Sequence, residues 1–204
     1  MPAGSSHLTI VLSAALAGAA LLGGCGGGGN EKPTTTTTPP AATTTAPEPT
    51  GGIDPMAGAS TKPVVVRATN RQTALLTDVR AARHEGYDRV VFQFRNALPG
   101  YDVRYVALPV HQDGSGNVVP VQGRYVAQIR MENALDADLT KASAPLTYHG
   151  PMRFSPATPE VAELVRSGSF EGVLTWVAGL RDRVDYRVRT LNAPPRLVVD
   201  FRNH

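Results

Sequence analysis

Cysteine is almost absent from this chain, which contains Cys25 as its single cysteine among 204 residues. A disulfide within the chain is therefore excluded, because one thiol has no partner in the same molecule. The folded part must depend on its hydrophobic core alone.

The chain also lacks the patterns of common catalytic, metal and phosphate sites. No His-Glu-x-x-His spacing and no Gly-x-Ser-x-Gly elbow occurs, and dense glycines are confined to the segment after Cys25. The histidines of the folded part are scattered, at His84, His111, His149 and His204. We therefore expect a protein that is not an enzyme, with no catalytic residue, no metal and no cofactor.

One loop places oxygen side chains at alternate positions, as calcium-binding loops do. It runs from Asp113 through Ser115 to Asn117. However, Val118 stands at the sixth position and Arg124 at the twelfth, where calcium loops carry Gly and Glu. We expect the tip of a hairpin here.

Lysine is scarce in the folded part, which carries two lysines and 17 arginines from Ser60 onward and a net charge of +5. This excess of arginine is also typical of a GC-rich genome. Arg187 and Arg189 lie two residues apart on one face of a predicted strand. With Arg196 they predict a patch for carboxylates or phosphates, and Arg181 and Arg183 are candidates to extend it. The alternative is a solvated sheet face.

Two aromatic residues could stack on sugar rings, Tyr186 and Trp176. Tyr186 adjoins the arginines and is included among the candidate ligand-binding residues, whereas Trp176 lies between apolar neighbours and is expected in the core. Basic and aromatic residues are not interleaved, so no nucleic-acid partner is expected.

The N-terminal segment has the features of a secretion signal. An apolar run from Leu8 to Leu22 is too short and too rich in Ala and Gly for a comfortable membrane span. Leu22-Gly23-Gly24-Cys25 resembles a lipobox, although residues 1–7 carry no Lys or Arg. The resemblance implies a signal peptide over residues 1–24, cleavage between Gly24 and Cys25, and a diacylglyceryl anchor on Cys25 that attaches the protein to the membrane.

Residues 25–62 are rich in Gly, Thr, Pro and Ala, with almost no large apolar residue. Such a composition cannot offset chain entropy by burial, so we expect a disordered tether. As a flexible coil it would span roughly 35 Å, enough to hold a domain away from a membrane. The Thr-rich stretch is also a candidate for O-glycosylation, an unmodified spacer being the alternative.

Residues 63–204 are expected to form one domain of antiparallel strands. Apolar residues alternate in Val90 to Phe94 and in Val184 to Arg189, as in half-buried strands. Further strands are predicted at residues 75–82, 103–108, 125–131, 172–178 and 197–201. One short helix is predicted from Thr158 to Gly168, because Thr158 can cap it, Pro159 suits its first turn and Gly168 can end it. The predicted fold class is an all-β antiparallel sandwich with one short helix.

Two segments of the domain carry a family resemblance. Tyr186 to Phe201, with Pro194-Pro195-Arg196-Leu197-Val198-Val199-Asp200-Phe201, resembles the end of an AMIN domain. Leu76 to Arg80, followed by Gly86 to Phe92, is similar to its first hairpin. With the lipobox and the tether, the chain resembles the AMIN-like lipoproteins of actinobacteria. Residues 101–168 depart from the pattern as a long middle insertion, and no amidase domain is attached.

The resemblance implies a non-catalytic sandwich that localises proteins in the cell envelope. We therefore expect a lipoprotein on the outer face of the cell membrane whose domain binds peptidoglycan, another anionic wall polymer or an envelope protein. The alternatives are a scaffold that adds a strand of a secreted partner to its sheet edge, and a cell-wall hydrolase with an unrecognised site.

Overall fold

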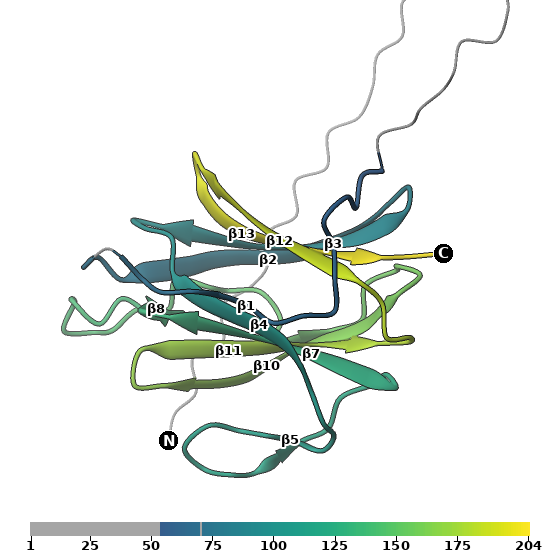
Figure 1. Ribbon diagram of the computed structural model, residues 1–204. Helices are drawn as coiled ribbons and strands as arrows, with labels where there is room; N and C mark the ends of the chain where they lie inside the picture. The colour runs from purple at the N-terminus through teal and green to yellow at the C-terminus, as the bar shows by residue number, and fades with distance from the viewer. Residues whose placement is uncertain (1–53, 70) are drawn as a thin grey trace, which may run out of the picture. The chain divides into compact units, whose positions relative to one another are not determined.

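The computed structural model describes residues 54–69 and 71–204, and Figure 1 shows the strands in these residues arranged in two main layers. The predicted signal peptide, Cys25 and most of the predicted tether lie outside the described residues. One layer is a six-stranded sheet in the order β1 (Val64–Val66), β4 (Gly100–Val106), β7 (Tyr125–Glu132), β11 (Val173–Leu180), β10 (Val161–Phe170) and β9 (Arg153–Phe154). The other is a five-stranded sheet in the order β12 (Tyr186–Asn192), β13 (Pro195–Arg202), β3 (Tyr87–Arg95), β2 (Ala74–His84) and β8 (Ala134–Leu135).

The core lies between the two sheets, which confirms the predicted β-sandwich. Trp176 on β11 is fully buried and meets Phe92 of the facing sheet, with ring centroids 5.9 Å apart. Within both sheets the long strands pair antiparallel, and the short β8 alone runs parallel to its neighbour β2. Alternating apolar residues of β3 and β13 fill this core: Val90, Phe92, Phe94, Leu197, Val199 and Phe201.

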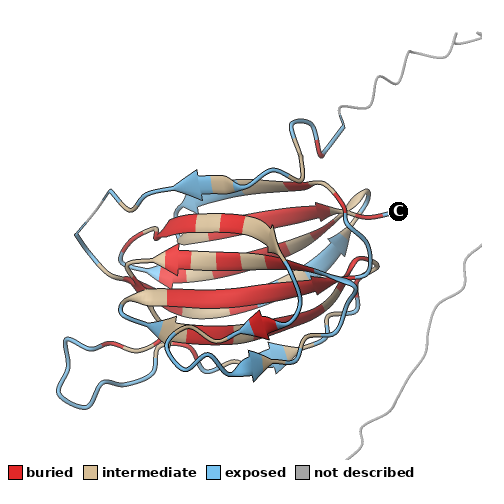
Figure 2. Ribbon diagram, turned by 60° about the horizontal axis from the view of Figure 1, so that its bottom comes forward, coloured by how far each residue is buried: buried red, intermediate tan, exposed pale blue. Residues whose placement is uncertain are grey.

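The six-stranded sheet is covered on its outer face as well. A small hairpin of β5 (Val110–His111) and β6 (Val118–Val119) crosses it and forms a second apolar cluster around Val126, Val165 and Val177. The central strand β11 is consequently buried along nearly its whole length (Figure 2). The predicted loop of oxygen side chains is the tip of this hairpin, as expected.

Asp113 fastens the hairpin to the sheet beneath it. Its carboxylate accepts hydrogen bonds from Arg130 at 2.9 and 3.1 Å and from the Thr175 hydroxyl at 3.1 Å. The side chain that suggested a calcium ligand is thus held by a cation and a hydroxyl group.

Replacement of Asp113 by alanine is expected to lower the free energy of unfolding by about 1–2 kcal/mol, because both partners lose their acceptor. Urea denaturation measures this loss, and amide hydrogen exchange should accelerate in residues 110–119. Ser115→Ala, in the same tip, removes only two exposed hydrogen bonds, one to Gln112 and one from the Asn117 amide, and should change stability little. Equal stability of the two variants would contradict the role of Asp113.

The predicted helix from Thr158 to Gly168 is wrong, since the described residues contain no helix and most of this segment is strand β10. The Thr158 hydroxyl donates to the Val161 carbonyl at 3.0 Å, as part of a turn that leads into the strand. The amides of Glu160 and Val161 donate to the buried carboxylate of Asp88, at 2.6 and 3.0 Å. The local capping signals are overridden because the segment gains a full antiparallel partner in β11.

The middle region, residues 101–168, forms part of the sandwich and is not an accessory insertion. It supplies most of β4, all of β7 and β9, and nearly all of β10, which are four strands of the six-stranded sheet. Inward-facing Val103 and Ile129 are fully buried in the main core. The six-stranded layer would not exist without this region.

Residues 54–62, which the sequence analysis includes in the tether, contact the domain. Met56 is 1% exposed, and the backbone of Ser60 exchanges two hydrogen bonds of 3.1 Å with Tyr186 on β12. The chain then enters β1, which pairs with β4 of the opposite sheet. The segment from Ser60 to Val66 therefore links one edge strand of each sheet.

Candidate functional site: an arginine face

The outer face of the five-stranded sheet presents a regular lattice of arginines. Residues that alternate with the core residues of β12, β13, β3 and β2 point outward, and the registers of the strands align them in rows. From one end of the sheet the first three rows are Leu191, Arg196, Gln93 and Asp78; Arg189, Val198, Val91 and Arg80; and Arg187, Asp200, Arg89 and Ala82. We call this surface the arginine face.

Asp200 is the centre of the arginine face and is 0% exposed. Arg89 binds it through two hydrogen bonds, from Nε at 2.7 Å and from Nη2 at 3.1 Å. Arg189 and Arg187 donate to its Oδ2 from the other side, at 2.8 and 3.3 Å. One carboxylate thus holds three guanidinium groups in fixed positions, and the long arginine side chains shield it from water.

The electrostatics of Asp200 favour its charged form. Burial alone would raise the pKa of this carboxyl, but the hydrogen bonds from Arg89 and the charges of Arg89 and Arg189 outweigh burial and lower it below the usual value. The same pair raises the pKa of Arg89. Asp200 is therefore ionised at neutral pH, and the three surrounding cations leave a positive excess around it.

A groove of about 280 Å³ lies on this face. Its floor is apolar, with Val91 and Val198 almost fully buried side by side. Four arginines surround this floor. Arg80 and Arg189 stand at the two ends of the same row, roughly 14 Å apart between Cα atoms across three strand spacings. Arg196 and Arg89 stand in the rows before and after it.

Arg196 differs from the other arginines of the groove. It donates to the carbonyl oxygens of Pro194 and Ala193, at 3.3 and 3.4 Å, and pairs with no carboxylate of residues 54–69 or 71–204. Its charge is thus not compensated locally. Over the whole face, five arginines oppose Asp78 and Asp200, which gives a net charge of +3.

The next row adds an aromatic cluster at one end of the groove. His84 and Tyr87 stack with ring centroids 4.8 Å apart and an angle of 11° between the planes. The guanidinium of Arg89 lies 5.0 Å from the centroid of the Tyr87 ring. Such a cluster offers a flat surface beside the cations.

The structure separates the predicted site residues. Arg187, Arg189 and Arg196 lie together on the arginine face, as predicted. Tyr186 does not join them: it is 1% exposed and points into the core, where its hydroxyl lies 2.7 and 2.8 Å from the carbonyl oxygens of Lys62 and Val103. Burial raises the pKa of Tyr186 to about 12. Tyr186 therefore packs in the core and lies apart from the arginine face.

The two candidate arginines before β12 also lie elsewhere. Arg181 donates to the carbonyl oxygens of Thr158 and Pro159, at 3.0 and 2.8 Å. Arg183 stacks over Tyr105, 5.1 Å from the ring centroid. Both therefore belong to the loop end of the sandwich.

Sequence reasoning missed Arg80 and Arg89, which β2 and β3 contribute to the same face. The signal was present in their alternation with buried residues, because Arg80 lies between Val79 and Ala81 and Arg89 between Asp88 and Val90. Only the pairing of β3 with β13 shows that Arg89 stands beside Asp200.

The arrangement can bind anions by paired hydrogen bonds from guanidinium groups and can pack an apolar or ring-shaped body on its floor. Among the described residues, no three His, Cys, Asp or Glu side chains come together in a way that could hold a metal ion. Nor does this part of the chain contain a helix long and apolar enough to cross a membrane.

Comparison with protein families identifies an AMIN-like domain over residues 74–203, more than half of the chain. The match covers β2 to β13, which includes the middle region, residues 101–168, and the whole arginine face. Neither the search of curated proteins nor that of solved structures finds a match. The chain belongs to the AMIN-like domain family.

Proposed function

We propose that this protein is a non-catalytic envelope lipoprotein whose arginine face binds an anionic polymer of the cell wall. The AMIN-like domain suggests a peptidoglycan-related or envelope-associated role. The finer statements, that Cys25 carries the lipid and that the ligand is a wall polymer, are the proposal. They rest on the lipobox-like Leu22 to Cys25 and on the chemistry of the arginine face.

The observation that carries the proposal is the preorganised positive groove. A surface arginine normally loses side-chain entropy when it binds a ligand. Here Asp200 has already ordered Arg89, Arg187 and Arg189, so a ligand gains guanidinium contacts at a smaller entropic cost. The span from Arg80 to Arg189 suits a ligand with several anionic groups along its length. Peptidoglycan stem peptides and teichoic acids both have this character.

A salt series with insoluble cell wall tests the proposal. The purified protein should pellet with the wall at low ionic strength, and the bound fraction should fall steeply as salt is added, because mobile ions screen exposed charges beyond roughly 10 Å at 0.1 M. Wall from which teichoic acid has been removed distinguishes the two polymers. Absence of pelleting at every salt concentration would contradict the proposal.

The exposed edge of β12 supports a second candidate, strand addition by an envelope protein. Ser60 covers this edge at Tyr186, and beyond that residue no described strand pairs with it on the side opposite β13. Backbone groups of alternate residues up to Asn192 can therefore accept a partner strand. Salt-insensitive capture of one envelope protein, abolished by a proline at Thr190, would favour this candidate.

A further inference from the structure

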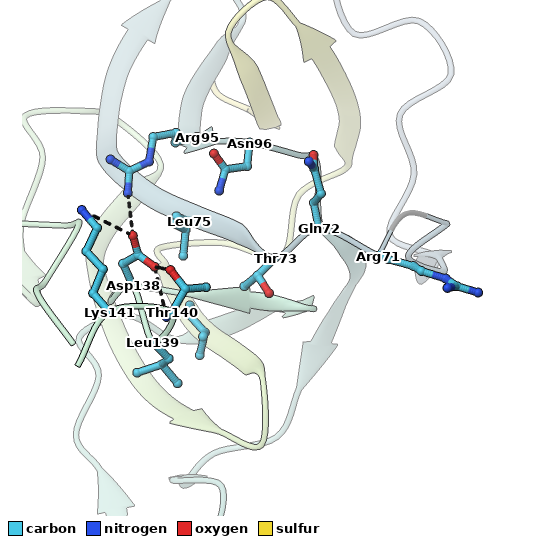
Figure 3. Close-up of a pocket in the computed structure, with 11 residues that line it drawn as sticks. Arg71, Gln72, Thr73, Leu75, Arg95, Asn96, Asp138, Leu139, Thr140 and Lys141 are labelled. Atoms are coloured by element: carbon cyan, nitrogen blue, oxygen red, sulfur yellow. Dashed lines mark hydrogen bonds and ion pairs between the residues drawn. The ribbon is translucent and has the colours of Figure 1, made fainter. Parts of the chain in front are cut away.

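A second cavity of about 520 Å³ lies at the opposite end of the five-stranded sheet from the His84 and Tyr87 pair. The segment before β2, the end of β3, and β8 with the loop after it surround this cavity (Figure 3). It shares no lining residue with the groove of the arginine face. Its chemistry is therefore independent of the proposed wall-binding site.

Asp138 organises one wall of this cavity. Its Oδ1 accepts hydrogen bonds from the Thr140 amide at 3.2 Å and from the Thr140 hydroxyl at 2.5 Å. These bonds, above all that of the hydroxyl, lower the pKa of the Asp138 carboxyl, which remains ionised at neutral pH. Asp138 is thus held by its own loop, and its second oxygen faces the cations of the cavity.

Two cations lie near that oxygen, and neither is within ordinary hydrogen-bond distance of it. The Asp138 Oδ2 lies 3.6 Å from Nη2 of Arg95 and 3.9 Å from Nζ of Lys141. Both distances are longer than ordinary hydrogen bonds, so these cations retain donors for another acceptor. Their side chains are 53% and 63% exposed. Arg71 also borders the cavity but points away from it in Figure 3. The cations that face Asp138 therefore leave a net charge of +1.

The remaining wall of the cavity combines leucines with neutral hydrogen-bonding groups. The leucines are Leu75, Leu135 and Leu139, and Leu139 is 64% exposed. Asn96, at the end of β3, adopts a left-handed backbone with φ of 77° and points into the cavity (Figure 3). Thr73 lies across from it, fixed by a 3.3 Å hydrogen bond to Asn133.

We propose that this cavity binds the terminal carboxylate of a short peptide that ends in small apolar residues. The carboxylate lies between Arg95 and Lys141, whose net charge with Asp138 matches one negative charge. The apolar side chains of the peptide rest on the leucines. The peptide amides meet the side-chain amide of Asn96 and the hydroxyl of Thr73. A volume of about 520 Å³ is within the range of small-ligand sites.

Amide chemical shifts of the full chain in detergent micelles test this proposal with N-acetyl-alanyl-alanine and its C-terminal amide as probes. The free acid should shift residues 71–75, 95–96 and 138–141, and the amide should bind roughly tenfold more weakly because it lacks the charge. Equal binding of the two probes would overturn the proposal. So would shifts confined to the arginine face, which would show general anion binding there.

Matched variants assign the contact to particular side chains. Lys141→Gln should weaken binding of the free acid roughly tenfold. The amide spectrum of this variant should otherwise remain that of the folded protein, because the Lys141 side chain is largely exposed. Arg71→Gln makes the same charge change at a side chain that points away, and its binding should match that of the wild type. Inorganic phosphate, added at equal ionic strength, should shift the arginine face more than this cavity. An unchanged affinity in Lys141→Gln, or a stronger response of the cavity to phosphate, would contradict the assignment.

Discussion

Replacement of Asp200 by asparagine should lower the free energy of unfolding by about 3 kcal/mol, since removal of one partner from a buried ion pair leaves the opposite charge uncompensated. Here the variant leaves Arg89, Arg187 and Arg189 close together around a neutral group. The amide of asparagine also presents donors toward guanidinium groups, which have no acceptor to offer. Urea denaturation of the purified variant and wild type measures the loss.

Asp78→Asn is the matched control for Asp200→Asn. It makes the same change on the same face, but the Arg80 and Asp78 side chains are both 45% exposed, so the loss of free energy of unfolding should be below about 1 kcal/mol.

The pH dependence of stability adds a second check on Asp200. Since folding lowers the pKa of Asp200, its stabilising contribution is present above the unfolded pKa of about 4 and disappears as the pH falls through the folded value. The difference between wild type and Asp200→Asn should therefore shrink below about pH 4. A difference that is constant with pH would contradict the assignment.

Charge reversal at Arg196 is expected to produce the largest loss of wall binding with an intact fold. Arg196 has no carboxylate partner among the described residues, so Arg196→Glu leaves no orphaned acid behind. It places a negative charge beside the groove, and binding at low salt should weaken by about tenfold or more, since a hydrogen bond to a charged group contributes about 1.5–3 kcal/mol. Co-sedimentation with cell wall measures the change.

Arg71→Glu provides the control for Arg196→Glu. Arg71 precedes β2, is exposed, and borders the second cavity and not the groove of the arginine face. The net charge of the protein changes equally in both variants, whereas only Arg196→Glu alters the groove. Equal losses in the two variants would show that overall charge, and not the arginine face, determines binding.

Variants of Arg187 and Arg189 are less suitable for testing wall binding, although the sequence analysis names both as candidate binding residues. Both side chains donate to Asp200 in the structure. Their replacement by glutamate would place acids beside a buried carboxylate and destabilise the sheet, so a loss of binding would not separate recognition from folding.

The long strands could be predicted from alternation because one face of each is buried and the other is not. The predicted segment Val90 to Phe94 is part of β3, and the predicted segment Val184 to Arg189 overlaps β12 from Tyr186 onward. Strand β10 could not be predicted, because its entry carries helix-capping residues and its pairing with β11 includes two register shifts. The local pattern at Thr158 is compatible with both structures, and only the long-range partner decides between them.

The arginine face could be predicted only in part, for a similar reason. Arg187 and Arg189 share a face within one strand, which local spacing reveals. The central role of Asp200 depends on three strands that meet in one register, with Arg89 separated from it by more than a hundred residues. Adjacency in the sequence places Tyr186 beside Arg187, but neighbouring residues of a strand point to opposite faces.

The central claim, that the arginine face binds an anionic wall polymer, is tested most directly by mapping amide chemical shifts during titration with a soluble peptidoglycan fragment that retains its stem peptides. The account predicts that the largest shifts occur at the floor and rim of the groove, around Val91, Val198 and Arg196, and that they diminish with added salt. Shifts confined to the edge of β12 or to the opposite sheet, with the groove unaffected, would contradict the account.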